Sequence, residues 1–191
     1  MVTAKDIEGL FHDQLSSIEN EDTRKQTVAT WVEAAKLGGW QSVADLKAMP
    51  FTLLTETHGI SLIEHTIAVT EGALALADAQ ESAYSRMPYK VNMDRLIAGG
   101  LLHDVGKLLE TEKDEKGGFR KSLKGMYARH PISGAILAAK CGLPDDIVNT
   151  IACHAKEGED APRVLETVLI HQADFATFDP LVMLEKGQLI P

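Results

Sequence analysis

The stretch that most constrains the fold is Leu101–Lys107, in which a His–Asp pair follows an apolar run. Apolar residues recur at helical spacing over 97–105, so a buried helix is predicted to run into this pair. Neighbouring side chains on an ideal helix point about 100° apart. For His103 and Asp104 to face one metal ion, the helix must end or distort there, and we expect Gly106 to provide that end. A buried histidine beside a helix-terminal aspartate would give the same local pattern.

Helical periodicity dominates the chain of 191 residues, and 45% of the residues are hydrophobic while only 5% are aromatic. These values predict an all-α domain with a sizeable core. The segment 110–125 is charged and contains the turn signal Lys116-Gly117-Gly118, so a loop or short hairpin is expected there. Helices are expected over residues 3–19, 21–37, 43–49, 60–79, 92–104, 131–141, 144–154 and 163–177.

The chain is predicted to comprise three parts. Residues 1–57 form a small N-terminal helical extension, which holds both tryptophans but shows no obvious chemistry. It is expected to pack on the main domain, and roles in dimerisation or in shaping a substrate mouth remain open. Residues 58–180 form the main helical domain, and 181–191 form a short apolar tail that we expect to dock on it.

The formal net charge of −9 argues against a broad electrostatic footprint for nucleic acid or an anionic membrane. A small basic pocket remains compatible with this charge, and Arg120, Lys121, Lys124 and Arg129 form a locally basic run. That run is equally compatible with a solvated loop. Two cysteines form no disulfide framework, and neither a signal peptide nor a membrane-spanning run is evident, so a cytoplasmic protein is predicted.

Histidines gather at positions that suit metal ligation. An aspartate, Asp174, also lies within an otherwise apolar helix, where a carboxylate is costly unless it is paired or bound to metal. Each histidine alone is compatible with a hydrogen-bonded core residue, and His171 could pair with Asp174 across one turn. Their joint occurrence around an adjacent His–Asp pair favours a metal site. The four histidines in question are His65, His103, His130 and His154.

The order of these residues resembles the HD superfamily of metal-dependent phosphohydrolases. The resemblance rests on His65, on His103-Asp104 within His-Asp-Val-Gly-Lys, and on Asp174 within Gln-Ala-Asp, and it covers about residues 58–180. It implies an all-helical core with a metal ion at its centre. The ligands that the resemblance implies for that ion are His65, His103, Asp104 and Asp174.

Two further segments resemble the dinuclear branch of this superfamily. One is Arg129–Gly134, and the other is Ile151–His154 followed by Glu157, although Ala155 replaces a second histidine there. The resemblance implies a second ion on His130 and His154, with Asp104 bridging two ions about 3.5–4 Å apart that activate a water. Fe, Mn, Co, Ni and Zn all suit these ligand types, so the metal identity stays open.

The activity predicted from this resemblance is hydrolysis of a phosphoester of a nucleotide or a related small molecule. Asp104 and Lys107 are the candidate catalytic residues, and Lys107 and Arg129 are the candidate contacts to the substrate phosphate. For Lys107 the alternative is a lysine that caps a helix C-terminus. His58 and Glu64 are near enough in sequence to support His65.

Several alternatives to this activity stay open at the sequence level. A di-iron HD-type oxygenase would use the same ligand types on a small polar substrate, and a non-catalytic HD module would serve in signalling. The segment Gly59–Thr66 is similar to the HD domain of bacterial 3′–5′ exoribonucleases, whereas the Gly-Tyr-Pro motif of cyclic-di-GMP phosphodiesterases is absent. An extended nucleic acid substrate is disfavoured by the charge, and a homodimer is compatible with the sequence.

Overall fold

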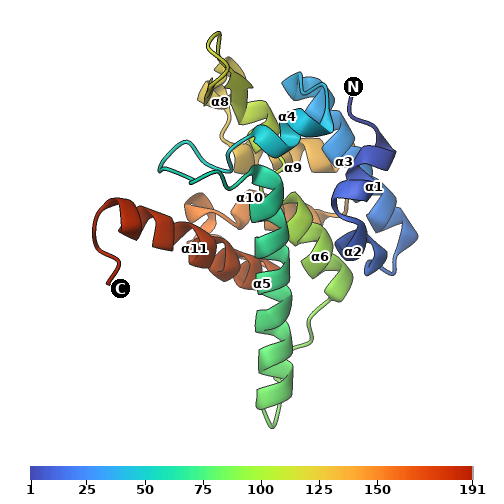
Figure 1. The fold of residues 1–191 in the computed structure, drawn as a ribbon. Coiled ribbons are helices and arrows are strands. Elements are labelled where there is room, and N and C mark those ends of the chain that lie inside the picture. The colour runs from blue at the N-terminus through green and yellow to red at the C-terminus, as the bar shows by residue number, and fades with distance from the viewer. Residues whose placement is uncertain (191) are drawn as a thin grey trace.

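The structure, a computed structural model, describes residues 1–190 and consists almost entirely of helices (Figure 1). The elements are α1 (Ala4–Leu10), α2 (His12–Ser16), α3 (Glu21–Gly38), α4 (Val43–Ala48), α5 (Leu62–Ala83), α6 (Met93–Leu102), α7 (Lys107–Glu110), β1 (Thr111–Lys113), β2 (Phe119–Lys121), α8 (Leu123–Tyr127), α9 (His130–Lys140), α10 (Asp145–Cys153), the 3₁₀ turn η1 (Lys156–Gly158) and α11 (Leu165–Glu185). The prediction of an all-α domain is confirmed.

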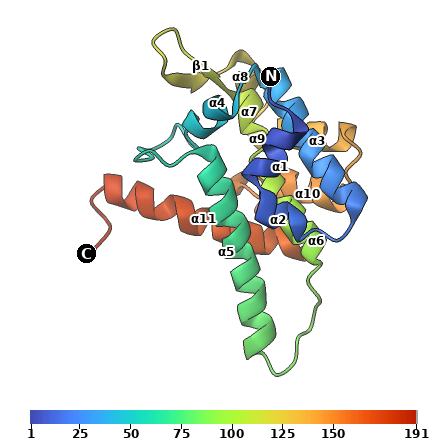
Figure 2. The same ribbon diagram turned by 45° about the vertical axis from the view of Figure 1, so that its right-hand side comes forward.

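Helix α6 lies at the centre of the packing. It contacts α3, α5, α10 and α11, and α10 also packs on α9. The long helices α5 and α11 pack against each other, and in both views each of them extends beyond the other helices (Figures 1 and 2). The His–Asp pair that follows α6 therefore lies where four helices meet.

Serine, threonine and asparagine side chains cap the starts of α1, α3, α4, α5, α6 and α8, as capping rules predict. Ser42 starts α4 and Ser61 starts α5, each in a reciprocal capping box with the acidic residue three positions later. At the other end of α3, Gly39 has a φ of 82°, which is the left-handed conformation that ends many helices. The expected helix over residues 3–19 is instead two short helices separated at Phe11, which is fully buried.

The N-terminal helices share one hydrophobic core with the helices around α6. Two indole N–H groups join the two parts: Trp31 Nε1 donates to the carbonyl of Leu101 at 2.8 Å, and Trp40 Nε1 donates to that of Leu108 at 2.8 Å. Both carbonyls lie in the last turn of a short helix and have no partner within it. The division of the chain at residues 57 and 58 stays a prediction.

The C-terminal part differs from expectation. Helix α11 was expected to end near Thr177, but it continues through Pro180 to Glu185. Proline inside a helix removes one backbone hydrogen bond, and the contacts of Phe178 and Leu181 with the core favour continuation past it. The expectation of a docked tail is wrong for residues 184–190, which are exposed, and Pro191 lies outside the described residues.

The charged segment after α7 forms the expected hairpin. Strands β1 and β2 pair antiparallel with Thr111 opposite Lys121. The turn contains Gly117 at a φ of 82°, a conformation that glycine adopts without strain. The hairpin stands at the edge of the molecule, beside α8 (Figure 2).

We predict that Trp31→Phe lowers the free energy of unfolding by about 1–3 kcal/mol, because the buried carbonyl of Leu101 loses its donor. Urea unfolding followed by circular dichroism measures this change. Phe11→Leu is the matched control for lost packing, since it removes a ring that packs on Trp31 but no hydrogen bond. A separate early transition in the fluorescence of Trp40 would contradict the shared core.

Candidate metal centre

The His–Asp pair lies just beyond the end of α6. That helix ends at Leu102, His103 occupies its C-cap, and a turn leads to α7 at Lys107. The expectation that the helix must end for both side chains to converge is therefore confirmed. The assumed role of Gly106 is wrong, because its φ is −63° and it precedes α7 rather than ending α6.

Gly106 is required for a different reason, which is the close approach of two helix starts. A Cβ atom at this position would lie 2.1 Å from the carbonyl oxygen of His130 and 2.8 Å from the amide nitrogen of Gly134. The absence of a side chain thus lets the start of α9 lie against the turn that carries Asp104. This contact brings His130 to the site from a distant part of the sequence.

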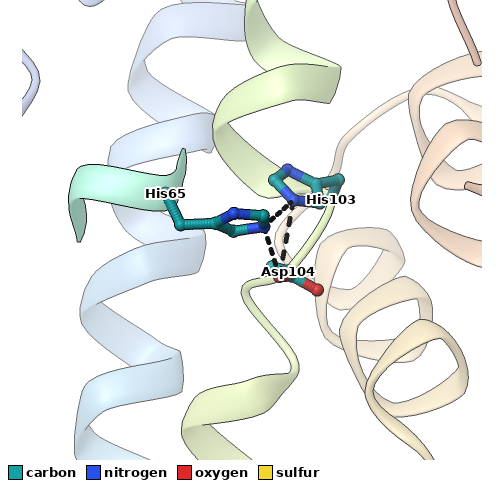
Figure 3. A group of neighbouring side chains, drawn as sticks. All are labelled: His65, His103 and Asp104. Carbon is teal, nitrogen blue, oxygen red and sulfur yellow. Dashed lines mark hydrogen bonds and ion pairs between the residues drawn. The ribbon is translucent and has the colours of Figure 1, made fainter. Parts of the chain in front are cut away.

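Two groups of potential metal ligands share the carboxylate of Asp104. One consists of His65, His103 and Asp104, and the other of Asp104, His130 and His154. Figure 3 shows the first group: His65 from α5 and the two residues after α6 point toward one another. All four histidines and Asp104 are buried.

Each oxygen of the Asp104 carboxylate faces a different pair of histidines. Oδ2 lies 3.2 Å from Nε2 of His65 and 3.4 Å from Nε2 of His103. Oδ1 lies 3.3 Å from Nε2 of His130 and 3.5 Å from Nε2 of His154. Asp174 joins the first group, because its Oδ1 lies 3.2 Å from Nε2 of His65. The arrangement is that of two ligand sets with one shared carboxylate.

The partners of the Nδ1 atoms fix the tautomers of three histidines. Nδ1 of His103 lies 2.6 Å from the carbonyl of Gly100, and Nδ1 of His154 lies 2.9 Å from the carbonyl of Ile151. Nδ1 of His130 lies 2.8 Å from a carboxylate oxygen of Glu110. Because these oxygens only accept, each Nδ1 carries the proton, and each Nε2 presents its lone pair to the site.

The same argument applies to His65 through a hydroxyl group. Thr177 donates its only O–H to the carbonyl of Asp174 at 2.8 Å. Its oxygen is therefore an acceptor for Nδ1 of His65, which lies 3.2 Å away. All four Nε2 atoms thus face Asp104, and in the neutral imidazoles that a metal ion requires they offer lone pairs, the arrangement that metal-binding histidines adopt when their other nitrogen is hydrogen-bonded.

Buried polar atoms without hydrogen bonds mark the centre of the cluster. Both carboxylate oxygens of Asp104 and Nε2 of His154 are buried and lack a partner of hydrogen-bond geometry. Nζ of Lys107 lies 2.6 Å from Oδ2 of Asp104 as an ion pair, without the angles of a hydrogen bond. Such orphaned lone pairs are costly unless a cation satisfies them. The residues present therefore fit a pair of divalent transition metal ions.

The electrostatics of the cluster favour positive charge at its centre. Burial raises the pKa of Asp104, but Lys107 and His103 outweigh burial and hold that pKa well below its usual range. Burial lowers the pKa of His65, yet the carboxylates of Asp104 and Asp174 raise it overall. Burial lowers the pKa of His130, which favours the neutral imidazole that a metal ion requires.

Glu110, at the end of α7, is a residue of the site that sequence reasoning missed. Its Oε2 accepts both the backbone N–H of His130 at 2.7 Å and the Nδ1–H of the same residue at 2.8 Å. Burial raises the pKa of Glu110, but these hydrogen bonds lower it to about 2, so the group is a carboxylate at neutral pH. Only the fold joins residues 110 and 130, and the sole sequence signal is an acidic residue shortly after the His–Asp pair.

Lys107 and Arg129 both lie at a cavity of about 700 Å³ above the cluster. Nζ of Lys107 contacts the carboxylate of Asp104 at 2.6 Å, which argues against the alternative of a helix C-terminal cap. Of the basic run, Lys121 and Arg129 line the cavity, whereas Lys124 donates to the carbonyl of Leu37 and Arg120 pairs with Glu112. The run is thus divided between the cavity and the solvated surface.

The contacts and exposure of three other residues differ from expectation: His171 was a possible partner of Asp174, and Glu64 and His58 were possible supports of His65. His171 donates from Nδ1 to the carbonyl of His154 at 2.6 Å and forms no pair with Asp174. Glu64 accepts from Ser61 in the capping box of α5, so it does not support His65. His58 is exposed and takes a positive φ of 51° in the loop before α5.

Sequence comparison agrees with this geometry. The sequence profile of the HD domain matches residues 62–176, which include every candidate metal ligand. The chain belongs to the HD-domain family. No solved structure matches the chain.

Curated relatives match part of this chain. Dihydroneopterin 2′,3′-cyclic phosphate phosphodiesterase of Methanocaldococcus jannaschii is 34% identical over 117 residues, which are 60% of this chain and 45% of that protein. Ribonuclease Y of Thermotoga petrophila is 32% identical over 118 residues, which are 62% of this chain and 18% of that protein. The chain thus spans less than half of either relative. Within residues 1–190, no helix has the length and hydropathy of a membrane span.

We predict that Glu110→Gln weakens the binding of one of two divalent ions by about 10–100-fold, because His130 loses the carboxylate that orients its ring. Affinity for the other ion should stay unchanged, since the contacts of His65 and His103 do not involve Glu110. Calorimetric titration of the metal-free protein with Mn²⁺ or Zn²⁺ measures both affinities.

Glu112→Gln is the matched control for that substitution. Glu112 lies two residues further along the chain, and its exposed carboxylate pairs with Arg120 at 2.8 Å. Equal effects of the two substitutions on metal binding, or an effect of Glu110→Gln on both ions alike, would refute a positioning role for Glu110.

Proposed function

We propose that this HD-domain protein is a metal-dependent phosphohydrolase that cleaves a phosphoester of a nucleotide or a related small molecule. The observation that carries the proposal is the Asp104 carboxylate, whose two oxygens each face a separate pair of histidine Nε2 atoms. In this proposal His65, His103, Asp104 and Asp174 hold one divalent ion, and Asp104, His130 and His154 hold a second.

Hydrolysis breaks one P–O bond, adds the oxygen of water to phosphorus and returns a proton to the leaving alcohol. Two bound divalent ions would supply Lewis acidity and a water of lowered pKa for this reaction. The chain would contribute the Nε2 atoms of four histidines and the carboxylate of Asp104, which belongs to both ligand sets. No serine or cysteine nucleophile is required, which agrees with a cluster built only from histidine and aspartate.

Lys107 is the residue that we assign to the substrate phosphate. Its Nζ lies 2.6 Å from Oδ2 of Asp104 and 5.6 Å from the centre of the Phe51 ring. The side chain is 17% exposed and lines the cavity, so the ammonium group can contact a ligand there. A lysine placed in this way neutralises phosphate charge as a point charge. Arg129, which lines the same cavity, is the second residue that we assign to substrate binding.

The names of the relatives support hydrolysis of phosphodiesters. One is a dihydroneopterin 2′,3′-cyclic phosphate phosphodiesterase and the others are ribonucleases Y. The net charge of −9 favours a small substrate over an extended nucleic acid. The convergence of all six candidate ligands argues against a non-catalytic signalling module, because such a module needs no lone pairs aimed at a common centre.

We predict that Asp104→Ala abolishes the binding of both ions and reduces phosphodiesterase activity by on the order of 10³-fold or more, because one residue serves both ligand sets. Elemental analysis and hydrolysis of bis-p-nitrophenyl phosphate measure the two effects. Asp179→Ala, at an exposed position of α11, is the control. Full activity of the Asp104 variant would refute the proposal, and oxygen uptake in place of hydrolysis would favour the oxygenase alternative.

We predict that His154→Ala reduces the metal content from two ions to one and leaves the fold intact. The reason is that His154 belongs only to the second ligand set, whereas the first set keeps all of its members. Elemental analysis gives the metal content, and circular dichroism checks the fold. His58→Ala is the matched control, since His58 is exposed and outside both sets. An unchanged content of two ions would contradict the assignment.

A further inference from the structure

The cavity above the metal cluster has two walls of opposite character. Its base contains Asp104, Lys107 and His130. One wall is formed by the loop after α4 together with α11, and it consists of Phe51, Leu53, Leu54, Phe175 and Phe178. The other wall is formed by α7, β2, the residue before α9 and η1, and it consists of Glu110, Lys121, Arg129, Lys156 and Glu157.

The apolar wall is built on a fixed base and exposes apolar surface at the mouth. Phe51 is buried and stacks on the ring of His65 with centroids 4.2 Å apart, and Phe178 meets Phe51 edge-on at 6.4 Å. Toward the solvent, Leu53 and Leu54 are 45% and 77% exposed. Exposed leucines beside a cavity are favourable sites for a planar apolar group, which removes them from water.

The loop that carries these leucines is tied down at its far end. Thr55 Oγ1 donates to the carboxylate of Glu185 in the last turn of α11. Figures 1 and 2 show this loop, between α4 and α5, above the outer half of α11. The extension of α11 past Pro180 thus supports the apolar wall, and the wall has a defined position relative to the cluster.

The charged wall presents more cations than its carboxylates neutralise. Nη1 of Arg129 lies 3.2 Å from Glu157, and its Nε lies 3.6 Å from Glu110. Nζ of Lys121 lies 3.4 Å from Oε1 of Glu110, the oxygen that also faces Nε of Arg129. Together with Lys156, this wall carries three basic and two acidic groups. Glu110 also accepts two hydrogen bonds from His130, so its charge is shared between the wall and the cluster.

One phosphate does not account for both walls. A scissile phosphate at the metal cluster already has Lys107 beside it. The cations of the charged wall lie at the mouth on exposed side chains, in a chain whose net charge is −9. A basic group of this kind, oriented by carboxylates, suits a second anionic group on the same ligand.

We propose that the cavity binds a phosphoester that carries a planar aromatic ring and a second phosphate. The ring lies on the wall of Leu53, Leu54 and Phe175, and the second phosphate lies on Arg129 and Lys121. The assignment of the scissile phosphate to the Asp104 cluster rests on the proposed function. The ring and the second phosphate rest on the two walls alone.

Binding of four ligands tests the proposal, with release of inorganic phosphate followed in parallel to separate binding from turnover: adenosine 3′,5′-bisphosphate, adenosine 5′-monophosphate, adenosine and ribose 5-phosphate. Calorimetry on the metal-loaded protein is expected to give about tenfold tighter binding of the bisphosphate than of the monophosphate. Arg129→Gln should remove most of that difference. Leu54→Ser should weaken the ligands that contain adenine by about three- to tenfold and leave ribose 5-phosphate unchanged.

Matched controls lie outside the cavity lining. Arg120→Gln removes a neighbouring cation that pairs with Glu112, and Leu123→Ser changes a leucine that is 65% exposed on α8. Neither control should change the binding of any ligand. Lys121→Gln gives a second test of the charged wall should Arg129→Gln disturb the fold, because Lys121 is an exposed strand residue.

Three results would overturn the proposal. The first is equal affinity of the intact protein for bisphosphate and monophosphate. The second is an equal loss of affinity for bisphosphate and monophosphate in Arg129→Gln and Lys121→Gln. The third is a loss of affinity for ribose 5-phosphate in Leu54→Ser. Failure of the proposed function would look different: the ligands would bind with the expected pattern, but no phosphoester would be hydrolysed.

Discussion

The rest of this structure depends on a buried carboxylate, that of Asp104. The residue is 1% exposed, and its two oxygens lie among four imidazole rings and one ammonium group. An isolated charge in such a place costs several kcal/mol. The fold is therefore stable only if the surrounding helices bring cations or metal ions to this carboxylate. The candidate ligands come from α5, α6, α9, α10 and α11 or from the turns beside them. Five helices thus place their ligands around one carboxylate.

Helix ends solve two problems at once in this arrangement. The carbonyls of the last turn of a helix lack partners within the helix, and here they accept from the side chains that the site needs. Gly100 accepts from Nδ1 of His103, and Ile151 accepts from Nδ1 of His154. The carbonyl of His154 in turn accepts from His171. The hydrogen bonds that end the helices therefore also fix which nitrogen faces the metal centre, and Trp31 completes the end of α6 from the N-terminal part.

Local patterns predicted most of the long helices and the hairpin, because helical periodicity and capping residues are properties of neighbouring positions. The residues that converge were predicted from the resemblance to the HD superfamily. The supporting contacts were not predictable in this way. Glu110 reaches His130 across 20 residues, and Thr177 reaches His65 across 112. Gly106 was misassigned because its role is a close approach to α9 that no local pattern encodes. Helix α11 continues past its expected end near Thr177, because the core contacts of Phe178 and Leu181 cannot be predicted from the local sequence.

The candidate metal ligands and the apolar wall of the cavity differ in how they relate to the family match. All candidate metal ligands lie within residues 62–176, the part that matches the HD domain. Three members of the apolar wall, Phe51, Leu53 and Leu54, precede this part, and Phe178 follows it. The metal ligands thus lie within the family match, whereas the apolar wall combines residues on both sides of that match with Phe175 inside it. Membership of the HD-domain family therefore accounts for the metal ligands, whereas most of the apolar wall depends on residues that precede or follow the family match.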